Sequence, residues 1–145
     1  MYFVDRQKIE QILCFLEAQL SRLEQKKEWN DELSQLALER IVQTSIDSVL
    51  DVGNAMIDGF IMRDPGSYED IVDILLDEKV ISEEIATQFK NVLPLRKMLI
   101  QDYIEVSHEQ LQTVFTANLA AFTQYPELIR TYLTNELGAV SAFKN

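Results

Sequence analysis

The sequence is poor in the residues that make turns and crosslinks. Its 145 residues include four glycines, three prolines and one cysteine. A β-protein needs glycine and proline at its many chain reversals, so this scarcity predicts a few long elements. With one cysteine an intramolecular disulfide is impossible, and the apolar run around Cys14 predicts a small buried side chain rather than a reactive thiol.

Basic residues are also scarce, with 13 Lys and Arg against 24 Asp and Glu and a net charge of −11. Such a chain repels a nucleic-acid backbone unless basic groups gather locally, so general coating of RNA is not expected and no DNA partner is predicted. No apolar run approaches the roughly 20 residues of a membrane span, and the N-terminus lacks the regions of a signal peptide. We therefore expect a cytoplasmic protein without a membrane partner.

Length and composition indicate one folded unit, since 145 residues with 47% hydrophobic content suit a single domain over residues 1–145. Apolar residues recur at spacings of three and four, the pattern of one helix face. In the first 30 residues that face contains Ile9, Ile12, Leu13, Leu16, Leu20 and Leu23. A second long helix is predicted over 33–61, with Leu38, Val42, Ile46, Val49, Gly53, Met56 and Phe60 on its face.

Helix starts and breaks follow from local signals further along the chain. Pro65 and Gly66 predict a loop after the second helix. Ser67, Ser82 and Ser107 stand where helix N-caps are expected; the helix after Ser82 is expected to cross Pro94 with a kink, and Pro126 to start the last helix. The predicted fold is an all-α antiparallel bundle of five to six helices.

A polar stripe runs along the second predicted helix at spacings of three and four. It consists of Arg40, Thr44, Asp47, Asp51, Asn54 and Asp58. One interpretation is a solvated face opposite the core, and the other is a polar groove, because both flanks of the stripe are apolar. The sequence leaves both open.

The segment 94–103 combines an apolar run with polar groups near a helix end. Four residues separate Arg96 from Gln101, and one residue separates Gln101 from Tyr103. This segment, together with 36–43, 46–47, 51–54 and 67–70, resembles the HepT-like ribonuclease toxins of the HEPN superfamily over nearly the whole chain. Their motif is an arginine, four to six residues, a histidine, one residue and a tyrosine. Gln101 stands where the motif has histidine.

The resemblance implies a HEPN-like homodimer that cleaves RNA without a metal or other cofactor. In the family the arginine binds phosphate and the histidine exchanges a proton with the 2′-hydroxyl or the leaving oxygen. Arg96 matches the arginine, whereas the amide of Gln101 cannot act as acid or base. We expect the cleft to be lined by Asp47, Asp51, Asn54, Lys97 and Asp102.

Three other titratable residues could replace the missing histidine as proton carriers. His108, the only histidine, lies seven residues beyond Gln101 and is expected to be partly exposed with a local hydrogen bond. Asp51 and Asp102 could carry a proton only if substantial desolvation raised the pKa of their carboxyls, which the sequence alone does not establish.

Tyr103 has two interpretations. As an ordinary tyrosine at a helix end it packs its ring and hydrogen-bonds through its hydroxyl. The resemblance implies instead that a minimal nucleotidyltransferase antitoxin attaches AMP to it and thereby blocks the RNA cleft.

Three functions remain open. The first is an RNA endonuclease toxin of a toxin–antitoxin pair with a degenerate active site at Gln101. The second is a catalytically inactive HEPN protein that binds RNA, nucleotide or a nucleotidyltransferase partner. The third, a structural dimer or adaptor, ranks last because it leaves the stripe and the segment 96–103 without a role.

Overall fold

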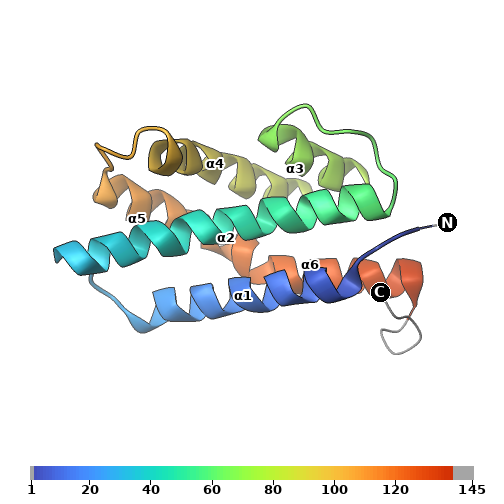
Figure 1. Ribbon diagram of the computed structural model, residues 1–145, viewed down its shortest axis with the longest axis horizontal. Coiled ribbons are helices and arrows are strands. Elements are labelled where there is room, and N and C mark those ends of the chain that lie inside the picture. Colours follow the sequence, from blue (N-terminus) through green and yellow to red (C-terminus); the bar gives the residue numbers. More distant parts are fainter. Residues whose placement is uncertain (1, 139–145) are drawn as a thin grey trace.

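The computed structural model describes residues 2–138, which form six α-helices and no strand (Figure 1). The helices are α1 (Arg6–Gln25), α2 (Glu32–Gly59), α3 (Tyr68–Asp77), α4 (Glu83–Ile100), α5 (His108–Ala117) and α6 (Leu119–Leu137). The predicted all-α class and helix number are confirmed. Residues 1 and 139–145, which belong to the predicted domain, lie outside the described residues.

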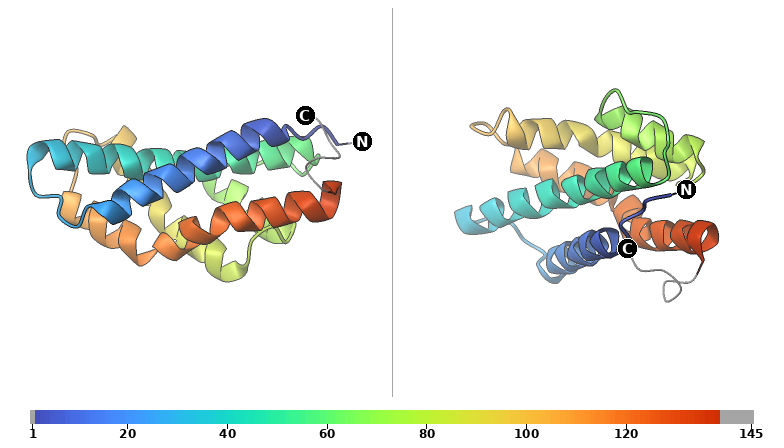
Figure 2. Two further views of the ribbon diagram at one scale, coloured as in Figure 1. Left: turned by 90° about the horizontal axis from the view of Figure 1, so that it is seen from below. Right: turned by 45° about the vertical axis from the view of Figure 1, so that its right-hand side comes forward.

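The two longest α-helices, α2 and α1, lie side by side and antiparallel, and α2 contacts every other helix (Figure 1). The pair α3 and α4 packs on one side of α2, while α6 lies antiparallel to α1 on the other (Figure 2). Fifteen residues of α2 are buried, and all but Ser34, Thr44, Ser45 and Ser48 are apolar or glycine. This helix therefore forms the centre of the bundle. No helix in the described part of the chain is both long and apolar enough to cross a membrane.

The loop between α2 and α3 runs back along α2, so that α3 starts near the middle of α2 instead of at its end (Figure 1). Arg63 holds this loop by donating to Asp70 at 2.9 Å and to Asp77 at 3.2 Å. The backbone N–H of Gly66 also donates to Asp70, and these bonds keep the pKa of the Asp70 carboxyl below its ordinary value. The loop thus determines where the first turn of α3 lies.

An aromatic cluster fills the core between α4, α5 and α6. Phe89 makes edge contacts with Phe122 and Tyr125, both at ring centroid distances of 5.1 Å, and Phe115 lies 4.7 Å from Phe122. The buried Tyr125 hydroxyl donates to the backbone oxygen of Val49 at 3.0 Å, and burial raises its pKa. The hydroxyl therefore stays protonated and links α6 to α2.

The three serine N-caps predicted from the sequence are confirmed. The hydroxyl of each accepts from the backbone N–H three residues later, as seen at Ser67, Ser82 and Ser107. The helix after Ser82 also continues through Pro94, as expected. These signals succeeded because each depends on a few neighbouring residues.

Two expectations were wrong. The last helix starts at Leu119, and Pro126 lies inside it, because Ala121, Phe122 and Tyr125 are fully buried and their packing outweighs the hydrogen bond that proline cannot donate. Cys14 is exposed, because it lies about 100° around α1 from the buried Leu13. Its thiol donates to Glu10 at 3.3 Å.

Candidate functional site

Arg96 connects three helices at the centre of the candidate site. From α4 its Nε donates to Oδ1 of Asp47 on α2 at 2.8 Å, and its guanidinium lies 4.4 Å from the ring centroid of Tyr68 on α3. The Arg96 and Asp47 side chains are 23% and 30% exposed. The guanidinium is therefore held in place by an ion pair and a ring, yet still reaches solvent.

The electrostatics around Arg96 favour its charged form. Partial burial acts to lower its pKa, but the hydrogen bond and charge of Asp47, together with Tyr68, outweigh burial and raise the pKa. Arginine is charged at any physiological pH in any case. A fixed cation with a planar fork of donors is suited to binding a phosphate group.

Asp51 lies one helical turn beyond Asp47 on the same stripe of α2. It reaches solvent, but partial burial raises the pKa of its carboxyl and the charge of Asp47 raises it further. Lys8 on α1 and Arg96 on α4 act in the opposite direction. The pKa of the Asp51 carboxyl is therefore raised, the direction that a proton carrier needs, although the side chain stays exposed.

The polar stripe of α2 divides into a packed part and an exposed part, so neither sequence interpretation describes all of it. Thr44 is buried and accepts from Gln19 on α1 at 2.7 Å. Asp47 is half-buried in its pair with Arg96. Asn54 and Asp58 are exposed.

Gln101 and Tyr103 lie where α4 ends. Gln101 is the C-cap of α4, its backbone N–H donates to the Lys97 oxygen at 2.8 Å, and its side chain is exposed. It lines a shallow hollow formed by Met98, Gln101, Asp102, Ile104, Glu105 and Gln110. Arg96 does not line this hollow, and five helical residues turn the side-chain direction by about 140°. Within one chain, Arg96 and Gln101 are therefore not in contact.

Tyr103 projects from the turn after α4 and is 67% exposed. Its hydroxyl makes no hydrogen bond within the described residues 2–138. The interpretation of Tyr103 as a packed, hydrogen-bonded tyrosine was therefore wrong. Nearby, Lys97 and Asp102 form an exposed ion pair at 3.6 Å, a geometry that contributes little stability.

His108 does not approach Arg96. It starts α5, and its Nε2 lies 2.6 Å from Oε2 of Glu39 on α2, with both side chains 25% exposed. The expected partial exposure is confirmed, but the expected local hydrogen bond is wrong, because the partner Glu39 lies 69 residues away on α2.

Tyr68 is the site residue that sequence reasoning missed. It lay in the segment 67–70 that supported the resemblance, and it directly follows the Ser67 N-cap. A tyrosine at the first position of a helix gave no sign of its partner, because the contact to Arg96 depends on the loop that returns α3 along α2.

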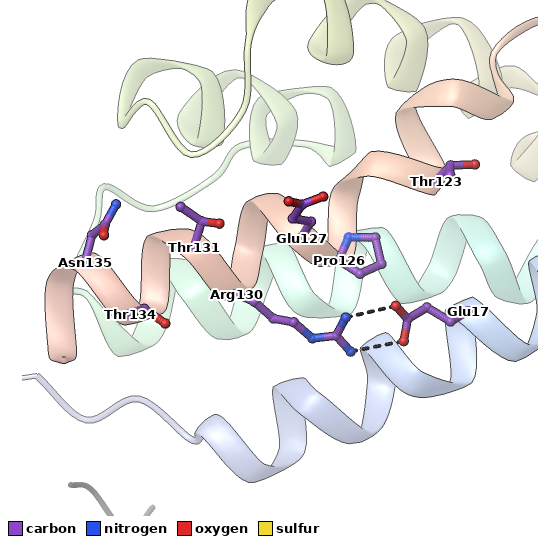
Figure 3. A pocket seen from close by; sticks show the side chains of 8 residues that line it. All are labelled: Glu17, Thr123, Pro126, Glu127, Arg130, Thr131, Thr134 and Asn135. Carbon is purple, nitrogen blue, oxygen red and sulfur yellow. Dashed lines mark hydrogen bonds and ion pairs between the residues drawn. The ribbon is translucent and has the colours of Figure 1, made fainter. Parts of the chain in front are cut away.

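A second hollow lies between α1 and α6 (Figure 3). Arg130 donates there to Glu10 and Glu17, and these carboxylates raise its pKa. The hollow shares no residue with the Arg96 cluster, and its cation, Arg130, is already paired with carboxylates. Within residues 2–138 no group of three or more His, Cys, Asp or Glu residues could hold a metal ion.

Comparison with known proteins identifies a family and several relatives. Residues 7–129 match the family model described as Ribonuclease HepT-like. The Bacillus subtilis (strain 168) protein named "Putative RNase YutE" is 49% identical over 144 residues, which cover 99% of this chain and 100% of that protein. The solved structure of YutE, described as a cytosolic protein of unknown function, has a TM-score of 0.95 over 99% of this chain and 100% of that one.

Two more distant solved structures have the same fold. The tri-AMPylated HEPN toxin of Shewanella oneidensis, in complex with MNT antitoxin, is 19% identical with a TM-score of 0.75, over 85% of this chain and 96% of that chain. A toxin–antitoxin structure with AMP-PNP gives a TM-score of 0.76 at 18% identity, over 85% of this chain and 97% of that chain.

Proposed function

Because the chain belongs to the HepT-like ribonuclease family, we propose that it is an RNA endonuclease of a toxin–antitoxin pair with a degenerate site at Gln101. The observation that carries the proposal is Arg96, fixed against Asp47 and Tyr68 while its guanidinium still reaches solvent. A guanidinium held in this way can bind an RNA phosphate without first ordering a flexible side chain.

RNA cleavage without a metal uses the 2′-hydroxyl as nucleophile. The O2′–P bond forms, the P–O5′ bond breaks, the 2′-hydroxyl loses a proton and the 5′ oxygen gains one. Arg96 supplies positive charge for the phosphate, while Gln101 can only donate or accept hydrogen bonds. General acid–base catalysis contributes about 10²–10⁴-fold, so we expect slow cleavage by this chain.

A homodimer is part of the proposal, because Gln101 and Arg96 of one chain lie on different parts of its surface. Two chains whose Arg96 and Lys97 residues face a common cleft would create local positive charge on an otherwise acidic protein. The relative described as cytosolic supports a cytoplasmic location.

The proposed partner is a minimal nucleotidyltransferase antitoxin that attaches AMP to Tyr103. Two structural relatives are described as toxin–antitoxin complexes, and one of them as AMPylated. The exposed ring and unpaired hydroxyl of Tyr103 make it accessible to such a modification. AMP on Tyr103 would lie beside Gln101, at the end of the helix that carries Arg96.

The second candidate function is an inactive HEPN protein that binds RNA, nucleotide or the nucleotidyltransferase. The neutral amide of Gln101 and the net charge of −11 favour it. An RNA-cleavage assay separates the two functions, with the wild type beside Gln101→His and Arg96→Ala. Lys27→Ala, which removes an exposed charge elsewhere, serves as the matched control for Arg96→Ala.

We expect slow wild-type cleavage that is lost in Arg96→Ala, retained in Lys27→Ala and raised about 10²–10⁴-fold in Gln101→His. Cleavage that starts only with Gln101→His would instead support the inactive binding protein. Equal rates for the wild type and Arg96→Ala would contradict a catalytic role for this site.

A further inference from the structure

Asp51 is the titratable group next to the Arg96–Asp47 pair that the proposed function leaves without a role. Residues four apart on a helix lie on one face, so Asp51 follows Asp47 along the surface of α2 where Arg96 approaches. An RNA phosphate bound to Arg96 would bring its ribose within reach of this part of α2.

Three charged groups act on the pKa of the Asp51 carboxyl. Asp47 on the same helix is the like charge, Lys8 approaches from α1 and Arg96 from α4, and no charged group of α3 acts on it. Partial burial, followed by the charge of Asp47, raises the pKa of the Asp51 carboxyl. A carboxylate with a raised pKa is a stronger base than an ordinary aspartate.

The oxygens of Asp51 are also available. Its side chain takes part in no hydrogen bond or ion pair within residues 2–138. Three other carboxylates of the site region are engaged, because Asp47 holds Arg96, Asp102 pairs with Lys97 and Glu39 binds His108. Asp51 is therefore an unengaged carboxylate on the helix face that Arg96 approaches.

We propose that Asp51 takes the place of the missing histidine as the general base for RNA cleavage, with Arg96 holding the phosphate. The proposal rests on the ribonuclease function proposed above. Asp51 accepts the proton of the 2′-hydroxyl as the O2′–P bond forms. The P–O5′ bond breaks and water protonates the 5′ oxygen, which leaves a 2′,3′-cyclic phosphate and a 5′-hydroxyl. Asp51 then returns its proton to water.

The test is Asp51→Asn, made both in the wild type and in Gln101→His, with Asp58→Asn as the matched control. Asp58 is exposed on the same helix, and its substitution changes the charge equally. In the wild type we expect Asp51→Asn to lower cleavage at least about 100-fold and Asp58→Asn to change it less than twofold. In Gln101→His, where histidine can accept the proton, Asp51→Asn should lower cleavage less than about tenfold.

The pH profile provides a second readout that a purely structural role would not change. A base must be deprotonated, so wild-type cleavage should rise with pH through a pKa above the ordinary value of about 3.9 for aspartate. In Gln101→His with Asp51→Asn, the rise should move to about 6.5, the ordinary histidine range.

Wild-type rates in Asp51→Asn would overturn the assignment of Asp51 while leaving the ribonuclease proposal intact. An equal loss in both backgrounds, with a fall in melting temperature, would show that Asp51 has a structural role and would also overturn the assignment. A wild type that does not cleave RNA at all would overturn both proposals.

Discussion

We predict that Asp47 stabilises the fold but competes with RNA phosphate for Arg96, and Asp47→Asn tests both effects. In the free protein the Asp47 carboxylate accepts a hydrogen bond from Nε–H of Arg96 at 2.8 Å, and both side chains are about a quarter exposed. A phosphate that binds Arg96 has to share the guanidinium with this carboxylate or displace it. Asp47→Asn keeps the shape and a hydrogen-bond acceptor but removes the competing charge.

The size of the effect follows from the exposure of the pair. Exposed ion pairs contribute about 0.2–1 kcal/mol, and hydrogen bonds to charged groups contribute about 1.5–3 kcal/mol. For a half-buried pair we take about 1 kcal/mol, which corresponds to about a fivefold change in an equilibrium constant. The Asp47→Asn variant should therefore bind RNA about fivefold more tightly than the wild type. Its free energy of unfolding should be lower by about 1 kcal/mol.

Fluorescence anisotropy with an RNA whose 2′-hydroxyls are methylated measures the affinity without cleavage. Asp58→Asn is again the control, because eleven helical residues place it about 16 Å from Asp47, beyond the Debye length of about 10 Å at 0.1 M salt. We expect less than a twofold change for this variant. If the Asp47→Asn variant binds this RNA no more tightly than the Asp58→Asn variant, Asp47 does not compete with phosphate for Arg96. Asp47 would then only position Arg96.

Two further predictions concern Tyr103 and the core. Co-expression with an active minimal nucleotidyltransferase should add the mass of AMP to the wild type and to Tyr68→Phe but not to Tyr103→Phe; an unmodified wild type would contradict the assignment. Gly53→Ala should lower the free energy of unfolding by about 1–2 kcal/mol in urea, because the new Cβ would lie 2.6 Å from Ile71 Cγ2, and overpacking outweighs the gain in helix propensity of at most about 1 kcal/mol. Gly66→Ala, whose Cβ would come no closer than 3.8 Å to Asp70, should unfold like the wild type; equal losses in both variants would count against the packing argument.

The helices were predictable to the extent that they depend on local chemistry. The serine N-caps and the Pro65–Gly66 break need only neighbouring residues, and each was found where expected. Pro126 and Cys14 were misjudged because their environment comes from other helices: the core holds the first turns of α6, and the rotation of α1 turns Cys14 outward. Local signals do not report such packing.

The candidate site shows the same division at the level of single residues. Arg96 could be selected from its spacing to Tyr103, because both belong to one short motif. Its partners could not, because Asp47 and Tyr68 meet it only through the crossing of α2, α3 and α4, which depends on the returning loop that Arg63 and Asp70 hold. The raised pKa of Asp51 likewise depends on burial and on charges from three helices.

The loss of histidine at position 101 has a physical consequence for the rest of the site. A histidine there would titrate near neutral pH at the end of α4, and no other group would need to carry a proton. If the proposed cleavage uses an aspartate as its base, a raised pKa makes that base stronger, and such a shift costs stability at neutral pH because the charged form is disfavoured in the folded protein. The pKa of the Asp51 carboxyl is shifted in this direction. If Asp51→Asn proves more stable than the wild type at neutral pH yet no longer cleaves RNA, the cost in stability is explained by catalysis.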